Sequence, residues 1–468
     1  MSRKLASESF LDYKTRVMDP KSSSFCGAKW HNATIWLGHG ETVSCHLPAS
    51  HKIPTEELKD NPTAIHNTLH KKKMRKMMLE GERPSECYKC WAVEDEGPEK
   101  ISDRVLKTRM YTDEDLEDIP LKKWDDDTFL RTLEISFDKA CNFACSYCNP
   151  SFSSTWVKDI KESGPYEHII SDEREHFSNT ADWTISAGKT DEDNPYISAF
   201  WEWWEADGGL ADTLEGIRIT GGEPIMHPSV WKLFDWFKEN PERGKNMRFA
   251  INSNLVPEKE KTFQRLLDVI DYVPGFEMFT SCEATGLQAE YIRDGIDYDK
   301  WLHNCQRLLA QPKLSRMYIM MTINALCLCS ITEFMDDMLD LRVSDDVGPF
   351  LSLNPVYNPE FQSISTLPTY ILEHYHEKLQ AWYDRRGNEL VDVEDVHVTR
   401  LISLLQKTIN NPHSEELLKK RQGDFKSFYT QYDKRRGKDF MSTFDPIMVD
   451  WYNGLAPTRV FKIEAGNG

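Results

Sequence analysis

The residues that decide the fold are Lys-Ala-Cys-Asn-Phe-Ala-Cys-Ser-Tyr-Cys-Asn-Pro at positions 139–150. Cys141, Cys145 and Cys148 follow one another with three and then two residues between them. Closed zinc sites and most iron–sulfur clusters take four protein ligands. Three thiolates leave one coordination position for an external ligand, so this loop predicts a metal centre with one open position. A catalytic zinc ion is the alternative.

The composition indicates a globular protein of more than one structural unit. The chain has 468 residues, 40% of them hydrophobic and 11% aromatic, and a net charge of −19. This acidic balance makes duplex nucleic acid a poor partner. The sequence shows neither a secretory signal nor an apolar run that predicts a membrane span, so we expect a cytoplasmic protein. Thiols stay reduced there, and clustered cysteines are then read as metal-binding or catalytic.

Six short apolar runs alternate with helical patterns over residues 128–360, which predicts parallel strands of an α/β fold. The predicted strands are 133–137, 217–220, 247–252, 276–281, 317–323 and 350–353. The predicted helices between them are 228–239, 258–270, 299–310 and 331–341. In parallel α/β barrels the chemistry lies at the carboxyl ends of the strands, and the three-cysteine loop follows the first of these strands.

The flanking segments differ from this pattern. Residues 30–45 alternate around a Gly-His-Gly turn and predict a β-hairpin, and a helix is expected at 62–80 with the basic run 71–76 on its solvated face. Residues 111–127 read as a linker, and 150–213 as a long insertion. The C-terminal region, 361–468, has helical patterns at 370–386, 398–409 and 414–434.

The spacing Cys-x3-Cys-x-aromatic-Cys, with Tyr147 as the aromatic residue, resembles the signature of radical S-adenosylmethionine enzymes. The resemblance implies a partial (β/α)6 TIM-type barrel over 128–360, with the insertion at 150–213. It also implies a [4Fe–4S] cluster on the three cysteines and S-adenosylmethionine on the fourth iron. Such an enzyme cleaves S-adenosylmethionine reductively to a 5′-deoxyadenosyl radical, which abstracts a substrate hydrogen. Its electron donor would be a flavodoxin or a ferredoxin.

Further residues resemble the cofactor-binding positions of that family. Gly221-Gly222-Glu223-Pro224 follows the second predicted strand and resembles the Gly-Gly-Glu-Pro that receives the methionine amino group. The remaining expected cofactor contacts lie after the third and fourth strands: Ser253, Asn254, Ser281, Glu283 and Arg293. Glu283 stands where related enzymes have aspartate, which puts its role in doubt.

A second set of cysteines lies before the barrel, at Cys26, Cys45, Cys87 and Cys90. Their spacing permits a Zn(Cys)4 site. The hairpin pattern Cys-x13-Gly-x4-Cys also resembles the twitch or SPASM module of radical enzymes, which implies an N-terminal auxiliary module over 20–110. We therefore expect a second, auxiliary [4Fe–4S] cluster, with zinc as the alternative.

The substrate is less constrained than the chemistry. Because twitch and SPASM modules predominate in enzymes that act on ribosomal peptides, the resemblance implies oxidation or another modification of a peptide or protein side chain. The alternatives are radical modification of a small molecule, sugar or nucleotide, and a non-catalytic zinc-binding scaffold. Cys282 and Cys327 are candidate catalytic hydrogen-atom donors because both follow predicted strands, although buried cysteines more often act as small hydrophobes.

Overall fold

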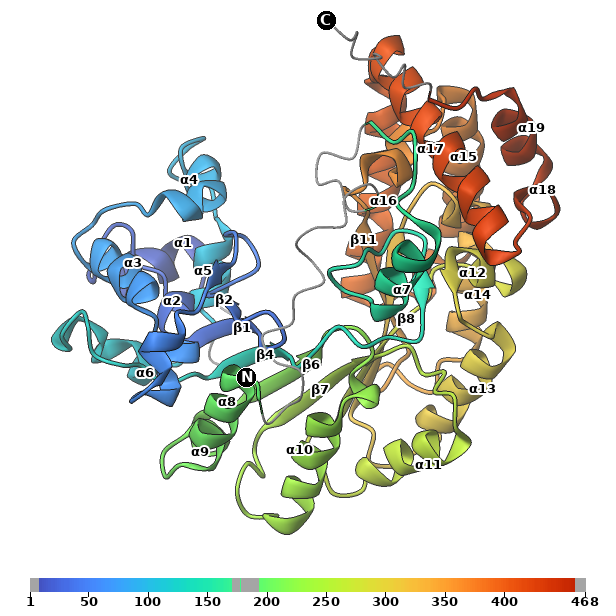
Figure 1. Ribbon diagram of the computed structural model, residues 1–468. Helices are drawn as coiled ribbons and strands as arrows, with labels where there is room; N and C mark the ends of the chain where they lie inside the picture. Colours follow the sequence, from blue (N-terminus) through green and yellow to red (C-terminus); the bar gives the residue numbers. More distant parts are fainter. Residues whose placement is uncertain (1–7, 171–176, 178–192, 459–468) are drawn as a thin grey trace, which may run out of the picture. The chain divides into compact units, whose positions relative to one another are not determined.

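The computed structural model describes residues 8–170, 177 and 193–458, which form two compact units (Figure 1). The first unit comprises the described residues of Met1–Asp138, Ser186–Gly221 and Pro228–Ala250. The second comprises those of Lys139–Ile185, Gly222–His227 and Ile251–Gly468. None of the described helices combines the length and the apolar character needed to cross a membrane.

The first unit contains five neighbouring strands in the order β3 (His51–Lys52), β2 (Glu41–Val43), β1 (Asn32–Trp36), β4 (Thr132–Ser136) and β6 (Gly216–Thr220). The predicted hairpin is confirmed, because β1 and β2 pair antiparallel. The same β1 also pairs in parallel with β4, with Ala33 opposite Leu133. The N-terminal hairpin therefore extends the sheet that carries the first strand of the predicted barrel.

The first unit has nine described α-helices and a buried core between Tyr13 and Ile119 that includes Cys26, Cys87 and Cys90. The helices are α1 (Phe10–Tyr13), α2 (Ala28–His31), α3 (Leu69–Leu79), α4 (Tyr88–Glu94), α5 (Asp103–Thr108), α6 (Asp113–Glu117), α8 (Pro195–Glu205), α9 (Leu210–Thr213) and α10 (Pro228–Glu239). The predicted solvation of the basic run is wrong for Lys71 and Arg75, whose side chains are buried.

The segment 111–127 is folded, so its interpretation as a linker is wrong. It contains α6, which starts with a capping box between Thr112 and Asp115. Asp115 is buried and forms an ion pair with Arg131, just before β4. A charged residue leaves water at low cost only when it is paired, and the sequence pattern does not reveal that pairing.

The second unit contains the parallel strands β8 (Glu277–Ser281), β10 (Arg316–Ile323) and β11 (Phe350–Pro355), in that order. The chain passes from the first unit to the second within β7 (Arg248–Ser253). All six predicted strands and the four helices between them are confirmed, the last three helices being α11 (Glu260–Val269), α13 (Tyr298–Leu309) and α14 (Ile331–Asp340). The chain is thus a mixed α/β protein with mostly parallel strands; the closed arrangement of a partial barrel stays a prediction.

Further elements of the second unit surround the three-cysteine loop. A small sheet pairs β5 (Ala144–Cys145) with β9 (Arg293–Asp294). The remaining helices are α7 (Ser154–Ser163), α12 (Gly286–Ile292), α15 (Thr369–Arg386), α16 (Asp392–Asn410), α17 (Glu415–Arg436), α18 (Phe440–Thr443) and α19 (Pro446–Gly454). The last five, drawn in orange to dark red in Figure 1, form the predicted helical C-terminal region, and its described part contains no strand.

Candidate functional site

The three-cysteine loop is held at its start by the first turn of α7. The hydroxyl of Ser154 accepts a hydrogen bond from the backbone N–H of Cys141 at 3.0 Å. Thr155 donates its hydroxyl to the carbonyl of Cys141 at 2.6 Å, and the indole of Trp156 donates to the carbonyl of Cys145 at 3.0 Å. These contacts fix the backbone of the loop and leave the thiols free to act as ligands.

The three thiols lie close enough to one another to interact electrostatically. Burial raises the pKa of Cys141 to about 12, and the neighbouring Cys145 adds to the rise. Burial also raises the pKa of Cys148, which is raised further by Cys145 and Cys141. Three thiolates this close together therefore need a strongly cationic group among them, since metal binding requires the deprotonated form. The chemistry of this donor set fits a metal cluster.

The pairing of β5 with β9 brings Arg293 to the cysteine loop. Cys145 lies opposite Arg293 in this two-stranded sheet, and Ser146 donates its backbone N–H to Ile292 at 2.7 Å. Nη1 of Arg293 lies 3.7 Å from Sγ of Cys145. The arginine thus supplies positive charge beside one prospective ligand.

Arg293 is also bound to Glu283, and both side chains are almost fully buried. The guanidinium donates from Nε and Nη2 to Oε2 of Glu283 at 3.0 and 2.8 Å. Tyr147 donates its hydroxyl to Oε1 of the same carboxylate at 3.1 Å. Burial raises the pKa of Glu283, and the arginine opposes the rise. The structure therefore joins three of the predicted residues in one network, with Arg293 engaged by the protein itself.

The Gly-Gly-Glu-Pro motif packs directly against the backbone that leads into the cysteine loop. A Cβ atom on Gly222 would lie 2.3 Å from the carbonyl oxygen of Ala140 and 2.6 Å from that of Lys139. Gly221 has a φ of +127°, a backbone conformation that residues other than glycine rarely adopt. Both glycines are thus required by close approach and backbone conformation, and Pro224 begins the short 3-10 turn that follows.

Glu223 is buried, and its carboxylate accepts hydrogen bonds from residues at the end of β7. Ser253 donates its hydroxyl to Oε1 at 2.8 Å, and Asn254 donates its backbone N–H to Oε2 at 2.6 Å. Burial raises the pKa of Glu223 to about 7, and these hydrogen bonds limit the rise. A carboxylate has lone pairs beyond these two contacts, so it can also accept from a ligand ammonium.

Asn142, which the sequence analysis did not select, links the cysteine loop to this carboxylate site. The side-chain amide of Asn254 donates to Oδ1 of Asn142 at 2.7 Å, and Asn142 donates to the carbonyl of Val256 at 3.0 Å. The backbone N–H of Glu223 donates to Ala140 at 2.6 Å. The cysteine loop, Glu223 and the end of β7 therefore form one connected group. The only sequence signal for Asn142 was its place between two cysteines.

The C-terminal region also contacts the loop, at Ser146. Gln362 donates its side-chain amide to the carbonyl of Ser146 at 2.8 Å, and Tyr429 of α17 donates its hydroxyl to that of Ser146 at 3.3 Å. Arg436 forms an ion pair with Asp294 of β9 at 2.7 Å. This region therefore helps to hold the backbone between two of the cysteines.

The other predicted residues of this site lie at strand ends. Ser281 is the last residue of β8 and lies opposite Met320 of β10. Cys282 and Cys327 are both fully buried, and the thiol of Cys327 donates to the carbonyl of Asn324 at 3.2 Å. Burial raises the pKa of Cys282 to about 12, and the charge of Glu283 adds to it, so this thiol lies near the Glu283 network.

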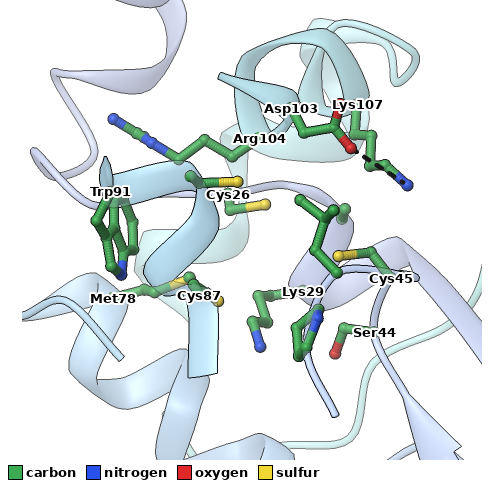
Figure 2. A pocket seen from close by; sticks show the side chains of 14 residues that line it. Cys26, Lys29, Ser44, Cys45, Met78, Cys87, Trp91, Asp103, Arg104 and Lys107 are labelled. Atoms are coloured by element: carbon green, nitrogen blue, oxygen red, sulfur yellow. Dashed lines mark ion pairs between the residues drawn. The ribbon is translucent and has the colours of Figure 1, made fainter. Parts of the chain in front are cut away.

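The four N-terminal cysteines line one pocket of the first unit. Figure 2 labels three of them, Cys26, Cys45 and Cys87. Cys26 precedes α2, Cys45 follows β2, and Cys87 and Cys90 lie at the start of α4. The pocket encloses about 380 Å³ of space free of atoms, part of it open to solvent. Segments more than 60 positions apart in the sequence thus present four sulfur atoms to one space.

Burial raises the pKa of Cys26, Cys87 and Cys90 as well. The pKa of Cys26 rises to about 12 and that of Cys87 to about 11, in each case chiefly through burial. A single zinc ion binds thiolates at about 2.3 Å, which would draw its ligand sulfurs to within about 4 Å of one another. Within the described ranges, no group of three or more His, Cys, Asp or Glu side chains is arranged to hold one metal ion.

Solved structures of SuiB from Streptococcus suis show a distant likeness to this chain. SuiB bound to S-adenosylmethionine is 12% identical, with 76% of this chain and 70% of SuiB covered and a TM-score of 0.32. SuiB bound to the precursor peptide SuiA is 12% identical, with 77% and 70% covered and a TM-score of 0.33. These scores are too low to carry an argument about function. No protein-family model matches the chain, and no curated protein does.

Proposed function

We propose that this protein is a radical S-adenosylmethionine enzyme. The observation that carries the proposal is the connected group of Asn142, Asn254 and Glu223, in which Asn254 links the three-cysteine loop to a buried carboxylate. This arrangement places an incomplete set of thiolate ligands near an acceptor suited to the ammonium of an amino acid.

Within this proposal, Cys141, Cys145 and Cys148 would hold a [4Fe–4S] cluster, and Glu223 would accept the amino group of S-adenosylmethionine. The bound cluster supplies the electron that cleaves the sulfonium to a 5′-deoxyadenosyl radical, and the electron comes from a flavodoxin or ferredoxin. Arg293 offsets negative charge at Cys145, and Ser253 and Asn254 orient the carboxylate of Glu223. Burial of these groups keeps water away from the reacting atoms.

The N-terminal pocket is proposed to hold an auxiliary [4Fe–4S] cluster on Cys26, Cys45, Cys87 and Cys90. The spread of the four sulfur atoms around one pocket supports a cluster over a zinc ion. Full coordination by four cysteines favours electron transfer over direct binding of substrate.

The proposed substrate is a peptide or protein side chain. The support is the resemblance of the N-terminal cysteine pattern to twitch and SPASM modules. Cys282 and Cys327 are proposed hydrogen-atom donors, because both thiols are buried at strand ends and Glu283 acts electrostatically on each.

The decisive experiment is single-turnover cleavage of S-adenosylmethionine by anaerobically reconstituted protein. Wild-type protein with dithionite should release 5′-deoxyadenosine, and the Cys141→Ala/Cys145→Ala/Cys148→Ala variant should release none. Its matched control is Cys305→Ala, a buried cysteine of α13, which should retain the activity. Persistence of 5′-deoxyadenosine in the triple variant would refute the assignment.

A further inference from the structure

Lys29 of α2 is a buried lysine that lines the four-cysteine pocket. Only 2% of its surface is exposed, and Figure 2 shows its side chain among those of the cysteines. Its ammonium group forms an ion pair with Glu86, the residue before Cys87, and its positive charge acts on the thiol of Cys87. A buried positive charge is therefore held in the wall of the pocket, near a prospective ligand sulfur.

The two other cations that line this pocket are engaged differently. Arg104 forms a two-point ion pair with Glu94, at 2.6 and 2.7 Å, and donates from Nη1 to the carbonyl of Phe25 at 2.6 Å. Lys107 is more exposed, and its Nζ donates to Nδ1 of His46 at 2.9 Å. Arg104 and Lys107 thus have other partners, whereas Lys29 is paired with Glu86, the residue next to Cys87.

The partner carboxylate of Lys29 lies outside the pocket lining. Glu86 divides its oxygens between Lys29 and His70, the latter at 2.7 Å. Lys29 thus lines the pocket and its partner carboxylate does not. At low effective dielectric this difference matters, because Coulomb energies fall with distance.

We propose that Lys29 is a positioning residue that raises the reduction potential of the auxiliary cluster through its buried positive charge in the pocket wall. The inference rests on the proposed function, which places a cluster in this pocket. One electron from a flavodoxin- or ferredoxin-type donor adds one negative charge there; no bond forms or breaks, and Lys29 keeps its proton. Hydrogen bonds to ligand sulfur and local positive charge favour the reduced form. Lys29 therefore stabilises the reduced state more than the oxidised state.

The test is an EPR-monitored redox titration of the full chain carrying Cys141→Ala, Cys145→Ala and Cys148→Ala, so that the N-terminal cluster is the only one present. In this background Lys29→Met should shift the midpoint potential to a more negative value, and Lys29→Arg should restore much of the shift. Glu86→Gln should shift the potential in the opposite direction, because it removes a negative charge. The matched control is Lys107→Met, which should leave the potential close to that of the parent.

The outcomes separate the inference from the function on which it rests. Suppose that the parent protein binds about four irons and that neither Lys29→Met nor Glu86→Gln changes its midpoint potential. This result overturns the inference and leaves the auxiliary cluster standing. A parent that binds zinc or no metal overturns both. If Lys29→Met loses its iron, Glu86→Gln decides alone: a less negative potential supports the role of Lys29, and an unchanged one overturns it.

Discussion

Arg293 and Glu283 form a buried ion pair, with 2.8 Å between Nη2 and Oε2, directly behind the cysteine loop. Their exposed side-chain fractions are 6% and 1%. Glu283 departs from the aspartate of related enzymes, and its longer side chain here meets both Arg293 and Tyr147. The sequence alone suggested that Arg293 faces the cofactor; the structure shows that the protein's own carboxylate also binds it.

Loss of Arg293 should destabilise the protein strongly, because Glu283 would be left buried without its cation. We expect Arg293→Met to lower the free energy of unfolding by about 3–5 kcal/mol, measured by chemical denaturation. The double variant Arg293→Met/Glu283→Gln should recover much of that loss. Equal destabilisation of the single and double variants would show that the pair is not coupled.

Gly222→Ala should disrupt the contact between the Gly-Gly-Glu-Pro motif and the cysteine loop, because its Cβ would lie 2.3 Å from the carbonyl oxygen of Ala140. Overpacking of this kind costs about 1–3 kcal/mol. Binding of S-adenosylhomocysteine, measured by calorimetry, should weaken by about tenfold or more. Gly454→Ala is the control, since a Cβ there meets nothing within 4 Å; equal affinities in the two variants would contradict the expected role.

The stability of the metal-free chain should depend on pH through Glu223. Burial raises its pKa from an ordinary value of 4.5 to about 7 in the folded state. The folded state therefore binds more protons than the unfolded state between these values, and stability falls as pH rises through that window. The stabilisation is fully present below the unfolded-state pKa, and up to about 3 kcal/mol is lost by pH 7 or slightly above.

The check is the pH dependence of unfolding in wild-type protein and Glu223→Gln. The variant has no titrating group at this position, so its stability should fall less than that of the wild type between about pH 4.5 and 7. Parallel curves for the two proteins would mean that Glu223 does not titrate in this range.

Replacement of Cys87 and Cys90 by Ala should remove about half of the iron from reconstituted protein, from about eight to about four atoms per chain. The loop cluster lies in the other unit and does not use these ligands, so some cleavage of S-adenosylmethionine without substrate turnover should survive. Iron and sulfide analysis measures the first effect, and chromatography of 5′-deoxyadenosine the second. Unchanged iron would show that the pair are not ligands.

The sequence by itself predicted the main strands and helices and the residues that could act as metal ligands. Alternation of apolar residues is a local property, so the six parallel strands and the hairpin could be placed from it. The two cysteine sets and the Gly-Gly-Glu-Pro motif are equally local, because their spacing is set within a few residues. The predictions for Lys71, Arg75 and the region 111–127 were wrong. Buried charges there are paired with residues distant in the sequence, and a local pattern does not indicate such pairs.

Only the tertiary structure decided which of these groups meet. The pairing of β1 with β4 joins the hairpin to the first parallel strand, and that of β5 with β9 sets Arg293 beside Cys145. Asn142 and Lys29 gained their significance in the same way, from contacts with Asn254 and Glu86. Such contacts form between residues far apart in the chain, and they depend on packing and on the pairing of buried charge, which the order of residues does not display.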